Sequence, residues 1–206
     1  MNLKNQFNHP AENFRLPYDS TDLLEVMGDK ILSWFPQHAR EYVVLCIGTD
    51  RSTGDALGPL AGTLFKEMKP KHLHVYGTLH EPIHAMNMEE SIGHVKHKHS
   101  NPYIIAIDAC LGRNRSIGHI IAEKGPLRPG AALNKALPYI GDISITSVVN
   151  ISGFMEHSIL QNTRLSFVMD MARNMAMLLE SIDSRMVYSH LPTILPVEQL
   201  QRKRPI

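Results

Sequence analysis

YVVLCIGTDRSTGDALGP, residues 42–59, is the stretch that decides the fold. Its first part, Tyr42–Ile47, is a continuous apolar run, which is typical of a strand buried on both faces of a parallel sheet. A polar loop from Thr49 to Asp55 follows, and apolar residues then recur at helical spacing until Pro70. The stretch therefore predicts a strand, a loop and a helix in the order that builds α/β folds.

Further units of the same kind surround this stretch, although no sequence repeat links them. We expect helices over 22–34, 87–97 and about 159–182, and strands over 72–77, 103–107, 117–123 and 143–151. This order predicts an open, mostly parallel sheet with helices on both faces. We expect one domain without internal boundaries, in which residues 1–20 are a loose segment and Val187–Ile206 form a C-terminal arm on the surface.

The composition is that of a globular protein and excludes several classes of function. The chain has 206 residues, 43% of them hydrophobic, and a formal net charge of +1. This charge gives no basic field for nucleic acid or for a membrane surface. The apolar runs are much shorter than the ~20 residues that span a bilayer. Two cysteines, Cys46 and Cys110, are too few for a disulfide scaffold. We therefore expect a cytoplasmic protein.

Two aspartates are placed where α/β proteins build their sites. Asp55 ends the loop after the first strand, and Asp108 directly follows the Tyr103–Ile107 strand. Sites in open α/β sheets form beyond the carboxyl ends of the strands, so the two carboxyl groups meet if these strands are neighbours. Such a pair shares a proton and can activate water with one group while the other protonates a leaving group. A helix N-terminal acid at Asp55 and a loop cap at Asp108 are the structural alternatives.

Other polar residues near these strand ends are candidates for binding a substrate. Arg51, Ser52 and Thr53 lie in the first loop, where their amides can polarise a carbonyl group. The segment His80-Glu-Pro-Ile-His84 matches the H-E-x-x-H zinc pattern, but a proline at its centre is incompatible with the helix that this pattern requires. We therefore expect a turn there, with Glu81 lining the pocket.

The remaining histidines and cysteines are given structural interpretations. His94, His97 and His99 alternate with lysines at a predicted helix end, where positive charge complements the helix dipole. Metal binding by them is the alternative. Cys110 is expected to be a buried small residue, because no histidine is identified that would orient it as a nucleophile.

The loop motif is similar to that of a known protease family. Gly48-Thr-Asp-Arg-Ser-Thr-Gly-Asp-Ala-Leu-Gly-Pro59 resembles the signature of the bacterial spore germination protease, and Ala106-Ile-Asp-Ala109 resembles its second signature. Over roughly Tyr42–Glu180 the chain looks like the YyaC-type sporulation proteins, with Gly141-Asp-Ile-Ser144 and Ser152-Gly-Phe-Met-Glu156 among the matching segments. This resemblance implies a three-layer α/β/α sandwich like that of hydrogenase-maturation endopeptidases.

The resemblance also implies roles for individual residues. Asp55 and Asp108 correspond to the two aspartates of the germination protease, and Lys135 to a basic position after a glycine turn. Gly54 stands where that family has proline, which predicts a looser loop before Asp55. Hydrogenase-maturation endopeptidases read nickel through Glu, Asp and His, but no third ligand is evident between Leu127 and His157, so we expect no metal and no cofactor.

The resulting hypothesis is a sporulation-associated peptidase of the forespore or spore core. Asp55 and Asp108 would hydrolyse a peptide bond of a protein or peptide substrate, with small acid-soluble spore proteins as the substrate class of the similar family. Neither nucleic acid nor a membrane is an expected partner, and a homo-oligomer remains open. The alternative is a catalytically silent protein of the same fold that acts as a binding or assembly module.

Overall fold

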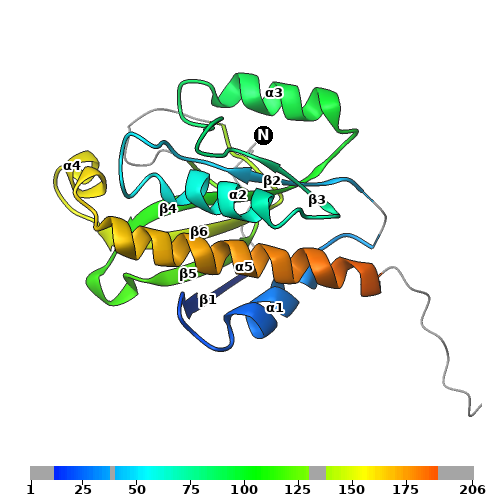
Figure 1. The fold of residues 1–206 in the computed structure, drawn as a ribbon, viewed down its shortest axis with the longest axis horizontal. Coiled ribbons are helices and arrows are strands. Elements are labelled where there is room, and N and C mark those ends of the chain that lie inside the picture. The colour runs from blue at the N-terminus through cyan, green and yellow to red at the C-terminus, as the bar shows by residue number, and fades with distance from the viewer. Residues whose placement is uncertain (1–11, 38–39, 130–137, 190–206) are drawn as a thin grey trace, which may run out of the picture.

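The chain folds around a six-stranded sheet (Figure 1). The computed structural model describes residues 12–37, 40–129 and 138–189. The strands are β1 (Asn13–Pro17), β2 (Tyr42–Cys46), β3 (Leu73–Tyr76), β4 (Tyr103–Gly112), β5 (His119–Lys124) and β6 (Ile143–Ile151). Their order in the sheet is β1-β5-β6-β4-β2-β3, in which β6, β4, β2 and β3 pair in parallel and β5 and β1 pair antiparallel. The predicted open, mostly parallel sheet is confirmed.

Helices cover both faces of this sheet. They are α1 (Gly28–Leu32), preceded by one π-helical turn (Leu23–Met27), α2 (Leu57–Glu67), α3 (Met88–Lys98), α4 (Glu156–Gln161) and α5 (Leu165–Ser189). Figure 1 shows α1, α2 and α5 on one side of the sheet and α3 on the other. The three-layer α/β/α architecture is therefore confirmed. In the described part of the chain, none of the helices is both long enough and apolar enough to cross a membrane.

The side chains of β2 alternate between the two faces of the sheet, and this explains why the whole strand is apolar. Val44 and Cys46 point to the larger core beneath α2 and α5, whereas Val43 and Leu45 point to the smaller core beneath α3. All residues of β2 are buried, because successive side chains enter opposite apolar layers. A central strand between two helical layers follows directly from the continuous apolar run.

Strand β4 is longer than the sequence indicates, so Asp108 lies within it and not after it. Pairing of β4 with β2 stops at Ile107, opposite Cys46, whereas pairing with β6 continues through Asp108 to Gly112. The continuing hydrogen bonds to β6 hold the segment extended although it is no longer purely apolar. Asp108 is therefore the first residue of β4 beyond the end of β2.

Three other expectations about the ends of the chain are corrected. Asn13–Pro17 is not loose but pairs with β5 as an edge strand, and Phe14 and Leu16 pack against the core. The predicted last helix is two helices, separated at residues 162–164, where Asn162 caps the end of α4. Helix α5 runs on to Ser189, so residues 187–189 of the expected C-terminal arm are helical. The rest of that arm, residues 190–206, lies outside the described residues.

Candidate active site

The loop after β2 depends on a glycine at its start. Gly48 has φ +144°, and a Cβ atom there would lie 2.0 Å from the carbonyl oxygen of Asp55. The amide of Thr49 donates a hydrogen bond to that same oxygen at 3.2 Å. The loop thus closes tightly on itself, and this closure returns Asp55 to the end of β2.

Gly54 ties the loop to α4 instead of loosening it. Its amide donates to the carbonyl oxygen of Leu160 at 2.8 Å, and a Cβ atom would come within 2.8 Å of the Leu160 side chain. Proline at this position would lose the donor and collide with α4. The prediction of a looser loop was therefore wrong, because the missing proline is replaced by a hydrogen bond to a different element.

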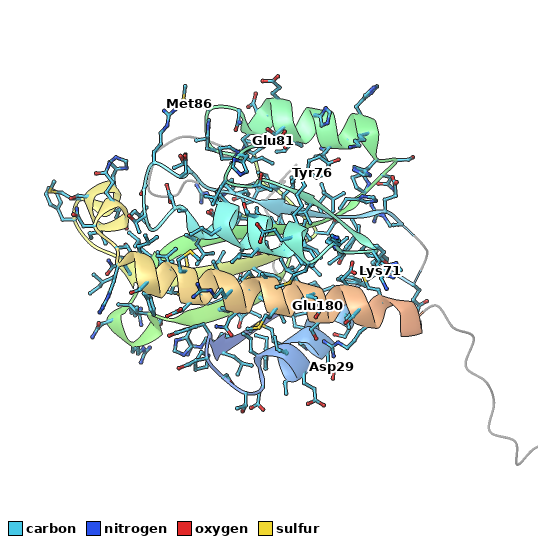
Figure 2. The ribbon with its side chains drawn as sticks, in the orientation of Figure 1. Asp29, Lys71, Tyr76, Glu81, Met86 and Glu180 are labelled. Carbon is cyan, nitrogen blue, oxygen red and sulfur yellow. The ribbon has the colours of Figure 1, made fainter. Side chains whose placement is uncertain are left out.

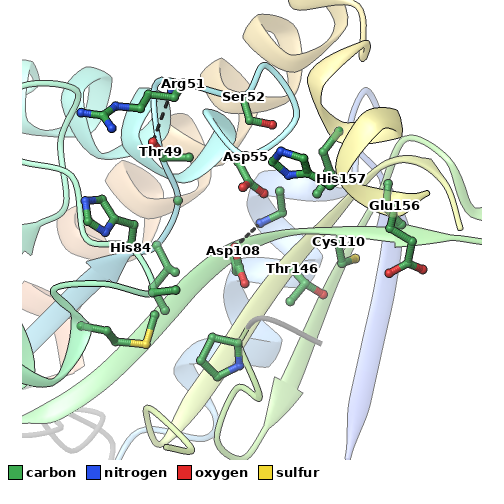
Figure 3. Close-up of a pocket in the computed structure, with 18 of the residues that line it drawn as sticks. Thr49, Arg51, Ser52, Asp55, His84, Asp108, Cys110, Thr146, Glu156 and His157 are labelled. Atoms are coloured by element: carbon green, nitrogen blue, oxygen red, sulfur yellow. Dashed lines mark hydrogen bonds between the residues drawn. The ribbon is translucent and has the colours of Figure 1, made fainter. Parts of the chain in front are cut away.

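Asp108 approaches the same point from the middle of the sheet. It pairs with Thr146 of β6, and its Oδ1 accepts a hydrogen bond of 2.8 Å from the amide of Ala109. Figure 3 shows the Asp55 and Asp108 side chains in one pocket, with Ser52 and His157 beside Asp55. Asp55 and Asp108 thus line one pocket beyond the carboxyl end of β2, as the sequence predicts.

The environment favours a proton on this pair of carboxyl groups. Burial, and then the nearby charge of Asp55, raise the pKa of Asp108 well above its ordinary value, although the Ala109 amide acts in the opposite direction. Burial also raises the pKa of Asp55, and the electrostatic interaction with His157 opposes that rise. The interaction with His157 thus favours the ionised form of Asp55, whereas the interaction with Asp55 disfavours the ionised form of Asp108. The arrangement therefore favours the proton on Asp108.

The two aspartates lie in a cavity of about 630 Å³, a size typical of ligand pockets. Of the residues predicted to bind substrate, Arg51 and Ser52 line this cavity, and the Ser52 hydroxyl is buried with no hydrogen-bond partner among the described residues. Thr53 and Glu81 are not among its lining residues. Glu81 is exposed in a turn closed by hydrogen bonds with Thr78. Lys135 lies outside the described residues.

Two histidines that the sequence did not identify as site residues also line this cavity, His84 and His157. Ile83 forms a parallel bridge with Ile47, which extends the sheet by one pairing and brings His84 to the cavity wall. His157 comes from the first turn of α4, which begins after Met155 in the left-handed conformation. The Ser152–Glu156 segment of the resemblance directly precedes His157 and is the sequence signal that could have located it.

The pocket residues do not form a preformed metal centre of the nickel-reading kind. Within residues 12–37, 40–129 and 138–189, no group of three His, Cys, Asp or Glu side chains at this pocket brings its ligand atoms within 4.8 Å of one another. Cys110 also lines the pocket, but burial raises its pKa to about 11, so it is not an activated thiolate.

Comparisons with known proteins place the chain in a family. Residues 15–178 match the family described as "Protein of unknown function (DUF1256)". The chain belongs to this family. It is 55% identical over 134 residues to the "Uncharacterized protein YyaC" of Bacillus subtilis (strain 168), a match that covers 65% of this chain and 65% of that protein. The predicted kinship with YyaC-type proteins is confirmed.

Among solved structures, the fold is similar to the [NiFe] hydrogenase maturation protease HycI from Thermococcus kodakarensis KOD1. The TM-score is 0.52 with 18% sequence identity, and the superposition covers 78% of this chain and 99% of the other. An identity this low supports the fold alone, so the expected hydrogenase-maturation-protease type of fold is confirmed.

Proposed function

We propose that this protein is a peptidase in which Asp55 and Asp108 hydrolyse a peptide bond with the help of a water molecule. The observation that carries the proposal is that two carboxyl groups, one from the loop after β2 and one from the neighbouring strand β4, line one cavity at the carboxyl edge of the sheet. Burial raises the pKa of both groups, but the charge of Asp55 raises that of Asp108 further, so Asp55 is the group that ionises first and Asp108 the group that keeps its proton.

The assigned roles follow from this difference. Ionised Asp55 accepts a proton from water as the water oxygen attacks the carbonyl carbon of the scissile bond. Protonated Asp108 donates a hydrogen bond to the carbonyl oxygen and stabilises the charge that develops there. When the C–N bond breaks, the proton held by Asp55 passes to the leaving nitrogen. His157 stabilises the Asp55 carboxylate before the attack.

The walls of the cavity support an extended peptide as the substrate. Buried Ser52 has a hydroxyl free to bond a substrate amide or carbonyl group, and exposed Arg51 suits an acidic side chain or a chain terminus. The apolar side chains of Leu127, Met88 and Leu160 cover other parts of the wall. The resemblance to the germination protease favours proteins of the spore as substrates, with small acid-soluble spore proteins as the first candidates.

The test is a cleavage assay with matched variants. The full chain is incubated with a panel of small acid-soluble spore proteins and synthetic peptides, and the products are read by mass spectrometry. We expect discrete cuts that Asp55→Asn and Asp108→Asn abolish. Asp50→Asn, an exposed aspartate of the same loop that does not line the cavity, is the control and should cut as the wild type does.

The pH profile adds a second criterion. Cleavage should decline at acid pH as Asp55 becomes protonated, and at alkaline pH as Asp108 loses its proton. Absence of any cut over the whole pH range, from a folded protein, contradicts the proposal and favours the catalytically silent binding module.

A further inference from the structure

A second cluster of titratable side chains lies at the opposite, amino-terminal edge of the sheet. Glu41 immediately precedes β2, His74 is the second residue of β3, and His99 follows α3 just before β4. One ligand atom of each residue can be chosen so that all three atoms lie within 4.8 Å of one another. The three elements therefore converge on one point, which is separate from the cavity of Asp55 and Asp108.

His99 is buried, although the sequence predicts a charged helix end at this position. Its side chain is 4% exposed, and its Nδ1 atom has no hydrogen-bond partner among the described residues. This atom lies 3.4 Å from Oε1 of Glu41. A buried ring nitrogen without a partner is costly, because it has lost its hydrogen bonds to water. Nδ1 therefore faces the Glu41 carboxylate, at the point where the three residues converge.

The opposite side of the His99 ring is fixed by a tyrosine. Nε2 of His99 lies 2.8 Å from the Tyr76 hydroxyl group of β3. When Nε2 carries the proton and donates to the Tyr76 oxygen, Nδ1 is left as a free acceptor. Metal-bound histidines are oriented in this way, with the second ring nitrogen donating to an oxygen. Figure 2 shows Tyr76 on the side of β3 that faces α3, as this role requires.

The other two groups are also positioned. Oε2 of Glu41 accepts a hydrogen bond of 2.9 Å from the amide of Ser100, which leaves Oε1 for the cluster. The His74 ring lies against the His99 ring, with centroids 4.5 Å apart. Both His74 and Glu41 are exposed, so an ion has access from solvent. The nearby Lys98 is the opposing positive charge, and its ammonium group lies over the Tyr76 ring.

We propose that Glu41, His74 and His99 bind a divalent transition-metal ion of the zinc type. Two imidazoles and one carboxylate are a donor set that Zn²⁺ accepts, with water completing the tetrahedron. The ion joins the entry to β2, the body of β3 and the end of α3, so its role is to stabilise the amino-terminal edge of the sheet. The proposal is independent of the peptidase activity.

The experiment is a Zn²⁺ titration of the full chain, stripped with EDTA, at pH 7.5 by calorimetry. We expect one ion bound through the cluster, with His74→Ala and Glu41→Gln each weakening the binding about tenfold or more. These variants change exposed side chains and should fold. His97→Ala, an exposed histidine of α3 outside the cluster, is the matched control and should bind Zn²⁺ within about twofold of the wild type.

Two further readouts separate this site from the cavity and from a simple ion pair. Zn²⁺ should raise the melting temperature of the wild type and of Asp108→Asn, but not of His74→Ala. Binding that is lost in Asp108→Asn and kept in His74→Ala would assign the metal to the cavity and overturn the proposal. Absence of saturable binding would also overturn it, and would leave Glu41 and His99 as an ion pair only.

Discussion

The two edges of the same sheet are built on opposite electrostatic principles. At the carboxyl edge, Asp55 and Asp108 are like-charged groups that disfavour each other's ionisation. At the amino edge, the Glu41 carboxylate faces the imidazoles of His74 and His99. Contact with His99 lowers the pKa of Glu41, and the Ser100 amide adds to this effect. The first arrangement suits a pair that exchanges protons, and the second suits a site that holds a cation.

The difference extends to the backbone around each edge. At the amino edge, Asp183 of α5 accepts hydrogen bonds from the amides of Lys71, His72 and Leu73, each at 2.8 Å. At the carboxyl edge, the Ser52 hydroxyl is buried without a partner in the described part of the chain. Proteins commonly accept such local costs where function requires them, and satisfy polar groups elsewhere. His99 Nδ1 at the amino edge is likewise buried without a hydrogen-bond partner among the described residues, so the edges differ in the backbone hydrogen bonds of Asp183 and not in unpaired polar groups.

The largest expected effect tests the chemistry of the carboxyl edge. Asp55→Asn should lower the rate of peptide cleavage by about 10²–10⁴-fold, the contribution of a positioned general base. Glu41→Gln, at the other edge, should leave the rate within about twofold of the wild type, as expected for a substitution remote from the site. The rates are compared by mass spectrometry of products at several substrate concentrations. Equal losses in the two variants would remove the distinction between the edges.

The next effect tests the stability of the amino edge. Asp183→Asn removes a buried charge that accepts three backbone hydrogen bonds, so it should reduce the free energy of unfolding by about 2–4 kcal/mol. Asp170→Asn on the same helix is the control. It removes an exposed ion pair with Arg173 and should cost less than about 0.5 kcal/mol. Urea denaturation measures both, and similar costs would contradict the structural role of Asp183.

The third prediction concerns a substitution that should stabilise the protein. Asp108→Asn should raise the free energy of unfolding at pH 8, because asparagine carries no acidic proton that burial beside Asp55 makes costly to lose. The raised pKa means that the folded chain binds this proton more tightly than the unfolded chain does. The loss of folding stability that the buried Asp108 causes is therefore absent below its unfolded pKa of about 4. It grows as the pH rises toward the folded pKa of Asp108.

The measurement is urea denaturation of wild type and Asp108→Asn at pH 4 and pH 8. The stabilisation should be clearly smaller at pH 4, which lies close to the unfolded pKa of Asp108. A gain that is the same at both pH values would show that the substitution acts through packing and not through charge.

The same contrast explains what the sequence could predict. Tyr42–Ile47 and the Gly48–Pro59 loop carry their structure locally, through a continuous apolar run and a glycine that permits closure. The strand order then brings Asp55 and Asp108 together by a general rule of α/β folds. The positions of His84 and His157 and the burial of His99 depend on which elements pack over the strand ends, and only the Ser152–Glu156 segment before His157 gives a local signal of that packing. The hydrogen bond between Gly54 and Leu160 is hidden for the same reason.

The smallest expected effect concerns the charge of Lys98, beside the cluster of Glu41, His74 and His99. Burial lowers the pKa of His74 first, and the charges of His99 and Lys98 add to this, against the opposing charge of Glu41. Lys98→Gln removes one of the repulsive charges, so the pKa of His74 should rise in an NMR titration of the imidazole signals. The same substitution should tighten Zn²⁺ binding by less than about tenfold, because solvent and salt screen exposed charges. Lys96→Gln, an exposed lysine two residues earlier on α3, is the matched control. If Lys96→Gln had as large an effect, the field at the cluster would be set by the net charge of the helix and not by the residue nearest to it.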